Sequence, residues 1–197
     1  MTSTQKRRGG DHRGDRARTD AELLESITAE DLGALGELYD RHHADVRRVL
    51  ERVTRRSSDV DDLVQATFLA VRPIARGFVG DQSARAWLCG IAIRLASRNE
   101  RALQRWMRAL TSLSWSVLAP PPVTPDRQAS GREELVVVEQ ALWKMSAKKR
   151  AAFVLVEMQG VPVDEAALAL QIPVASVRTR LFHAKKELRR ALRGAAW

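Results

Sequence analysis

Residues 163–186 read VDEAALALQIPVASVRTRLFHAKK, which is a short helical pattern, a tight turn and a longer helical pattern. Pro173 stands where the second helix would begin, and proline is well tolerated at a first helical position. The second helix has an apolar stripe at steps of three and four residues, formed by Val174, Val177, Leu181, Ala184 and Leu188. The stretch therefore predicts a helix-turn-helix.

The other sides of this second helix are polar and basic, which favours nucleic-acid binding. Ser176, Arg180 and His183 lie at i, i+4 and i+7 and so share one face. A helix-turn-helix presents its second helix to the major groove, where arginine reads guanine edges or grips phosphate. The candidate DNA-binding residues here are Ser176, Arg178, Thr179, Arg180, His183, Lys185 and Lys186. The alternative is a packing helix with a solvated basic face.

The rest of the chain also shows helical periodicity, with no strand-like alternation in residues 21–110 or 133–197. Between them, residues 111–132 hold four of the seven prolines. This composition predicts a linker that is locally extended and semi-stiff but lets the two domains take many relative positions. Residues 1–20 are polar and basic, and we expect a disordered arm. The predicted fold is all-α, with two small helical domains joined by a Pro-rich linker and a helix-turn-helix in the second.

The amino-acid composition excludes several kinds of function for this protein. The 197 residues carry 33 Lys and Arg against 24 Asp and Glu, a net charge of +9 that points to an anionic partner. The sequence contains no apolar run near the roughly 18 residues of a membrane span, so we expect no membrane insertion. The single cysteine, Cys89, excludes an internal disulfide and fits a reducing cytoplasm. Motifs of enzymes, metal sites and cofactor sites are missing, so neither catalysis nor a cofactor is predicted.

A second basic face lies in the predicted helix over residues 84–108. Its four arginines are spaced 4, 3 and 4 residues apart and line one side: Arg94, Arg98, Arg101 and Arg105. Stacked like charges are destabilising unless an anion screens them, and phosphate is the obvious anion. Nearby aromatic residues, Phe78, Trp87 and Trp106, could stack unpaired bases if exposed, but the core is the commoner place for the two tryptophans. A merely solvated arginine face is the alternative.

A third candidate face begins the helix before it. Asp62, Gln65 and Leu69 fall at i, i+3 and i+7, which makes a small mixed patch for a partner helix. The alternative is an ordinary helix start, because Asp61 and Asp62 suit the positive end of a helix dipole.

Three sequence blocks resemble the extracytoplasmic-function (ECF) class of bacterial sigma factors, in the sigma-70 family. DLVQATFL at 62–69 is similar to the family's DLVQETFL, and RAWL at 85–88 with Ile91-Ala92 is similar to its RAWL and IA. The block at 176–185, SVRTRLFHAK, is similar to TVRSRLHRAR. The resemblance covers nearly the whole chain after residue 20.

The resemblance implies a role for each face. The patch of Asp61, Asp62, Gln65 and Leu69 would dock on the clamp helices of the largest subunits of RNA polymerase core. The loop from Phe78 to Ser83 would capture a flipped base of the downstream (minus-10) promoter element, and the arginine-striped helix would hold the melting strand. The linker would cross the polymerase, and residues 174–186 would read the upstream (minus-35) element. The family also implies an anti-sigma factor as a partner.

Some residues depart from the family pattern. Ala66 replaces a glutamate, and Arg72-Pro73 replaces an aromatic-and-arginine pair, so that helix is expected to end near Arg72. Arg94 and Arg98 replace common Asn and Asp. Gln171 occupies the turn position where glycine is usual, so the turn is either strained by about 1 kcal/mol or differently shaped. The alternative function is a stand-alone helix-turn-helix regulator that binds duplex DNA as a dimer.

Overall fold

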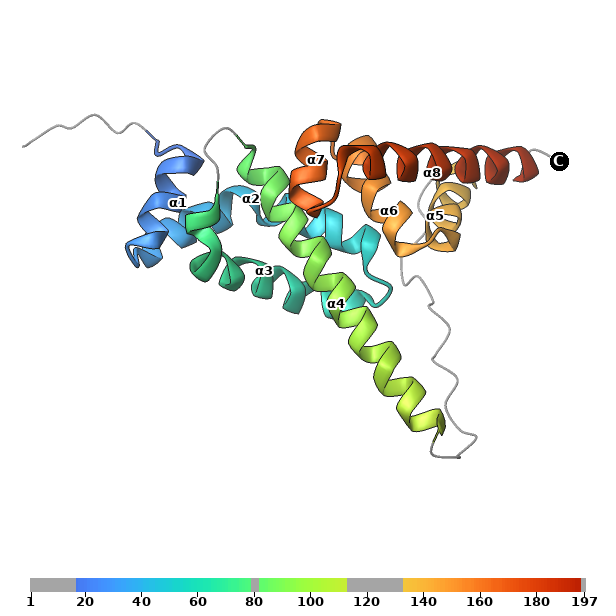
Figure 1. The fold of residues 1–197 in the computed structure, drawn as a ribbon, viewed down its shortest axis with the longest axis horizontal. Helices are drawn as coiled ribbons and strands as arrows, with labels where there is room; N and C mark the ends of the chain where they lie inside the picture. The colour runs from blue at the N-terminus through green and yellow to red at the C-terminus, as the bar shows by residue number, and fades with distance from the viewer. Residues whose placement is uncertain (1–16, 79–81, 113–132, 196–197) are drawn as a thin grey trace, which may run out of the picture.

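The computed structural model describes residues 17–78, 82–112 and 133–195, and every regular element in these ranges is helical. In chain order the elements are α1 (Asp20–Thr28), α2 (Leu32–Val53), the 3-10 turn η1 (Ser57–Asp59), α3 (Val60–Ile74), the 3-10 turn η2 (Ala75–Gly77), α4 (Ala84–Ser112), α5 (Glu133–Lys144), α6 (Ala147–Phe153), the wide π turn η3 (Val154–Met158), α7 (Val163–Leu170) and α8 (Val174–Ala195). Figure 1 shows their arrangement. The all-α prediction is confirmed.

Local signals in the sequence explain where the first helices begin and end. Thr19 and Glu22 form a reciprocal capping box at the start of α1, and the Asp31 carboxylate accepts the Ala34 N–H at the start of α2. Helix α3 continues through Pro73 and ends at Ile74, two residues past the expected end at Arg72, and the 3-10 turn η2 follows directly.

The fold begins slightly earlier than the sequence suggested. Arg18 binds Glu37 of α2 at 2.8 Å, and Arg41 of α2 binds Asp20 at 2.5 Å. These ion pairs attach the segment before α1 to the side of α2. Residues 18–20 therefore belong to the folded domain rather than to the predicted arm at 1–20, whose residues 1–16 lie outside the described part of the chain.

The C-terminal helices form the predicted helix-turn-helix. Val177 and Leu181 of α8 are buried beneath α7 and η3 together with Val154, Leu155 and Ala166. Gln171, between α7 and α8, has φ of 56° and ψ of 48°, so a non-glycine residue holds the left-handed conformation. Of the two possibilities for this turn, the strained one is correct.

The two groups of helices pack against each other. Buried side chains form one continuous cluster from Leu23 of α1 to Leu181 of α8. Helix α4 crosses α7 and then reaches away from the other helices (Figure 1). The predicted linker at 111–132 overlaps the last two residues of α4, and its remainder, 113–132, lies outside the described residues.

Candidate nucleic-acid and polymerase interface

Helix α8 buries its apolar stripe and exposes the opposite side, as the periodicity predicts. Val177, Leu181 and Ala184 are buried. The candidate DNA-binding side chains divide into exposed ones, Arg178, Thr179, His183, Lys185 and Lys186, and half-buried ones, Ser176 and Arg180. The helix thus presents a basic face beside the left-handed turn at Gln171.

Two contacts refine this face. Lys185 forms an ion pair with Glu157 of η3 at 2.8 Å, so its ammonium group already has a partner within the fold. Phe182 is 59% exposed on the polar side, and its ring meets His183 edge-on at 5.4 Å between centroids. The sequence interpretation omitted Phe182, although its position directly after the stripe residue Leu181 could have placed it on the open side.

The arginine face of α4 is only partly open. Arg98, Arg101 and Arg105 are exposed, whereas Arg94 is half-buried and donates a hydrogen bond to the backbone carbonyl of Ala169 in α7. Burial, together with the nearby charge of Arg98, lowers the pKa of Arg94. The four arginines therefore differ in environment, because α7 packs against the turn of α4 that carries Arg94.

The segment before α4 uses its candidate side chains structurally. The Ser83 hydroxyl accepts the Ala86 N–H at 3.3 Å and so caps α4. Phe78 is half-buried, and its ring lies 5.4 Å from that of Trp87 in an edge-on arrangement. Residues 79–81 and the side chain of Trp106 lie outside what the structure describes.

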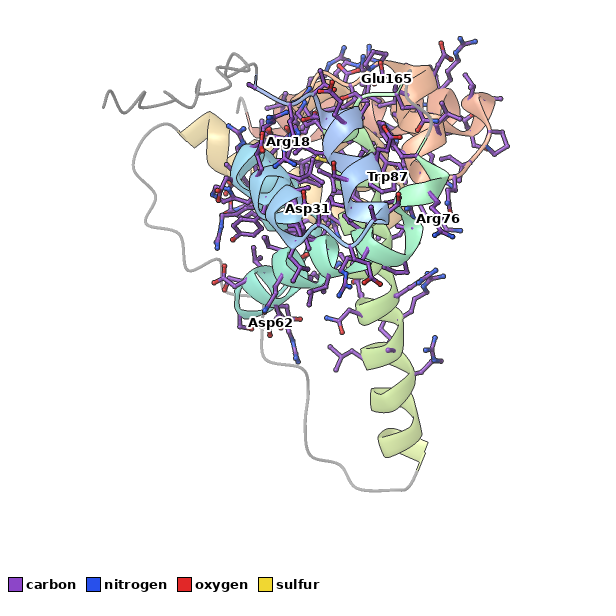
Figure 2. All side chains as sticks on the ribbon, turned by 90° about the vertical axis from the view of Figure 1, so that its left-hand side faces the viewer. Arg18, Asp31, Asp62, Arg76, Trp87 and Glu165 are labelled. Carbon is purple, nitrogen blue, oxygen red and sulfur yellow. The ribbon has the colours of Figure 1, made fainter. Side chains whose placement is uncertain are left out.

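The predicted docking patch on α3 is exposed. Asp62, Gln65 and Leu69 all face solvent, and Leu69 is 59% exposed. Asp61 is paired with Arg47 of α2. In Figure 2 the helix-turn-helix residue Glu165 lies at the top of the molecule, and Asp62 lies well below it, at the lower edge of the packed helices. The α3 patch and the helix-turn-helix therefore occupy different sides of the protein.

Three further features concern the thiol of Cys89, metal binding and membrane spanning. Cys89 is buried, and burial raises the pKa of its thiol to about 12. Within the described ranges, no three His, Cys, Asp or Glu side chains are grouped to hold a metal ion. None of the helices described here is long and apolar enough to cross a membrane.

Known proteins match both halves of this architecture. The family description "Sigma-70 region 2" matches residues 38–113, and "Sigma-70, region 4" matches residues 135–188. The ECF RNA polymerase sigma factor SigM of Mycobacterium tuberculosis is 32% identical over 184 residues, which are 93% of this chain and 88% of SigM. The chain belongs to the ECF sigma factors.

Further proteins that resemble this ECF sigma factor, in sequence or in structure, support the assignment to this family. The ferric citrate uptake sigma factor FecI of Escherichia coli is 31% identical over 168 residues, covering 83% of this chain and 88% of FecI. The structure of CnrH in complex with the cytosolic domain of CnrY superposes with a TM-score of 0.62 at 28% identity, covering 90% of this chain and 99% of CnrH. RpoE of Bartonella quintana, in complex with the anti-sigma factor NepR, shares the fold with a TM-score of 0.60 at 21% identity.

Membership in the ECF sigma factors decides between the two predicted functions, which were a sigma factor and a stand-alone helix-turn-helix regulator. An ECF sigma factor directs RNA polymerase to promoters, and residues 38–113, which a stand-alone regulator would use as a dimerisation or effector domain, match region 2 of the sigma-70 family. The stand-alone helix-turn-helix regulator is not favoured.

Proposed function

We propose that this sigma factor distributes polymerase binding, strand melting and upstream recognition over three separate surfaces. The α3 patch (Asp61, Asp62, Gln65 and Leu69) docks on the clamp helices of RNA polymerase. The loop from Phe78 to Ser83, with Arg98, Arg101 and Arg105 of α4, binds the downstream element as its strands separate. The α8 face reads the upstream element, and residues 113–132 join the two domains.

The observation that carries this proposal is the exposure of a mixed patch and a basic face on different sides of one chain. Leu69 is 59% exposed beside Asp62 and Gln65, which suits a partner helix that covers an apolar side chain within a polar rim. The exposed Arg178 and Thr179 on α8 suit base edges and phosphates in a major groove. Polymerase and promoter can thus be bound together.

A pair of complementary variants tests the division. Asp62→Ala with Gln65→Ala should weaken retention of the protein by immobilised core polymerase, and Glu25→Ala, an exposed acid on α1, is the matched control. Unchanged retention of the double variant would show that the docking surface lies elsewhere.

The converse variant is Arg178→Ala with Arg180→Ala. Each lost base contact should weaken promoter recognition by about 1–3 kcal/mol while polymerase retention stays normal. Arg193→Ala, near the end of the same helix, is the control. Transcription from a pooled promoter library with added core polymerase measures the effect, and equal loss of polymerase binding would contradict the assignment.

The proposal also covers partners and chemistry. Catalysis is left to the polymerase, and this chain supplies recognition and strand separation in the cytoplasm, where the polymerase acts. An anti-sigma factor is an expected partner, since Bartonella RpoE was solved in complex with the anti-sigma factor NepR, and CnrH in complex with the cytosolic domain of CnrY. Co-purification from the native cell would identify it.

A further inference from the structure

The exposed side chains of α3 form one line that continues past the α3 patch. Three residues of the line belong to the patch: Asp62, Gln65 and Leu69. The same side then carries Arg72 in the last turn of α3 and Arg76 in η2, and all five side chains are exposed. Their spacing of 3, 4, 3 and 4 residues is that of a coiled-coil seam over two heptads. The line is about 21 Å long, so a partner helix can lie along α3 rather than across it.

The other side of α3 is covered by the fold, whereas the line is open. Phe68 and Val71 are buried, and the Phe68 ring meets the ring of Tyr39 in α2 edge-on at 4.8 Å between centroids. Leu69, in the middle of the line, is 59% exposed and has polar or charged residues on both sides. An apolar centre within a polar rim is the usual arrangement of a protein interface. The line therefore has the composition of a docking surface over its whole length.

The two ends of the line carry opposite charges. Asp62 is the acid left for a partner, because Asp61 beside it is already paired with an arginine of α2. Among the residues that the structure describes, neither Arg72 nor Arg76 forms an ion pair, and the sequence has no Asp or Glu from 63 to 80. In Figure 2 Asp62 lies at the lower left of the packed helices and Arg76 at the right. A partner must offer positive charge at one end and negative charge at the other.

A protein helix fits this line better than a nucleic-acid strand does. The arginines alone would also suit phosphates, but Asp62 on the same line repels them, and the exposed Leu69 offers a phosphate backbone nothing to bind. A helix can cover Leu69 and pair with both charged ends. Arginine is also enriched at interfaces between proteins. Since the chain is an ECF sigma factor, RNA polymerase is the protein that this surface serves.

Arg72 distinguishes this end of the line from the family pattern. Where the pattern has an aromatic residue followed by arginine, this chain has Arg72-Pro73. A positive charge in the last turn suits the negative end of the α3 dipole, but that effect is confined to the last turn and does not account for Arg76, which lies beyond Ile74. Like charges four residues apart also repel each other. An acidic residue of the partner would remove this repulsion.

We propose that Arg72 and Arg76 extend the α3 patch into a seam that takes one helix of RNA polymerase lengthwise, with an acidic residue of that helix beside the arginines and a basic residue beside Asp62. This inference rests on the proposed docking of the α3 patch on the clamp helices. It adds the length of the contact, two residues and the charges of the partner. A polymerase helix in the reverse orientation would bring like charges together, so the two ends fix its direction along α3.

Charge reversal tests the seam through retention of the full-length protein by immobilised core polymerase. An exposed ion pair contributes up to about fivefold in affinity, so Arg72→Glu with Arg76→Glu should weaken binding by about tenfold at ~0.1 M salt. The loss should shrink at ~0.5 M salt, which screens exposed charges. Arg190→Glu with Arg193→Glu is the matched control, because it makes the same change in net charge on exposed residues of α8.

Two results of this experiment would overturn the seam. One is unchanged retention of the Arg72→Glu, Arg76→Glu variant. The other is unchanged retention together with weaker binding of a random-sequence single-stranded DNA, which would assign the two arginines to the melting strand instead.

A lysine variant identifies the acidic partner residue and serves if the glutamate variant does not fold. Residues 7–143 contain no lysine, so Arg72→Lys with Arg76→Lys places the only lysines of this half on the seam. Both charges remain, and retention should be rescued relative to the glutamate variant. In the complex with core polymerase, a carbodiimide adds to a carboxylate, the lysine amine attacks the activated acyl carbon, and an amide bond forms as a urea leaves with the carboxylate oxygen.

Mass spectrometry of the cross-linked peptides should show α3 joined to an Asp or Glu of a polymerase helix. A polymerase-bound lysine variant without such a cross-link would overturn the pairing. Failure of the proposed function is a separate result, because the wild-type protein would then not be retained, or Asp62→Ala with Gln65→Ala would leave retention unchanged. Failure of the seam alone leaves those two results as expected and removes only the effects of changing Arg72 and Arg76.

Discussion

Replacing Gln171 by glycine should stabilise the protein, although it removes a side chain. Gln171 ends α7 with φ of 56°, and its N–H donates to the carbonyl of Leu168 at 3.1 Å. A non-glycine residue in this left-handed conformation costs about 1–2 kcal/mol. Glycine removes that strain but gains about 0.4–1 kcal/mol of conformational freedom in the unfolded chain. The net expectation for Gln171→Gly is a gain of about 0.5–1 kcal/mol.

Urea unfolding of the full-length chain, followed by circular dichroism, measures this gain. For a slope of about 2 kcal/mol per molar urea, the midpoint should rise by about 0.3–0.5 M. Gln171→Ala retains the backbone strain and should stay within about 0.5 kcal/mol of the wild type. Gly160, which has φ of 68°, offers the converse change, and Gly160→Ala should be destabilising by about 1 kcal/mol. A Gln171→Gly protein no more stable than the wild type would refute the assignment of strain to this turn.

Three further stability predictions follow from single residues. The Cys89 thiol, with its pKa raised to about 12, stays protonated in the folded chain after the unfolded chain has lost its proton, so between about pH 8.5 and 12 it should lower the unfolding free energy by about 1.4 kcal/mol per pH unit. Comparing the pH dependence of unfolding in wild type and Cys89→Ala isolates this slope, and parallel curves would disprove it. Arg150→Met keeps the buried volume but leaves the Val53 carbonyl without its donor, and urea unfolding should show a loss of about 1–3 kcal/mol, with any gain in stability counting against the interaction. Thr19→Ala removes the capping box of α1 and should lower the unfolding free energy by about 1 kcal/mol, measured against the neutral surface change Glu25→Ala.

Features that depend on neighbouring residues in the chain were predictable from the sequence. The stripe of Val177, Leu181 and Ala184 on α8 is buried because a helix that packs on one side needs apolar residues at steps of three and four. The same periodicity predicted that Asp62, Gln65 and Leu69 share one side of α3, and all three side chains are exposed. These predictions needed only the geometry of one helix.

Features that join distant segments were not predictable in this way. The spacing of Arg94, Arg98, Arg101 and Arg105 placed Arg94 on a basic side of its helix but gave no sign of its partner Ala169, which lies 75 residues away. Arg150 drew no prediction from its local sequence, in which it follows two lysines, yet it is buried against a carbonyl 97 residues away. Ala102 is an apolar residue in α4 but is exposed, because α4 has left the other helices by that point. The periodicity of a helix does not indicate which other helix will pack against it.

The outer part of α4 has a thermodynamic consequence for DNA binding. Asn99 binds Asp59 of η1, Glu100 binds Arg55, and the Arg101 Nε beyond them donates to the carbonyl of Ser97 in its own helix. Past this point α4 extends away from the other helices (Figure 1). A short helical segment that receives little support from other helices is only marginally stable in water. In the proposed role of α4, a nucleic-acid strand that neutralises Arg101 and Arg105 would also remove the repulsion between their charges and favour the helical conformation. Part of the binding free energy is then used to order the helix. Measured affinity for DNA should understate the strength of the individual contacts, and binding should show a larger negative entropy than a rigid surface would produce.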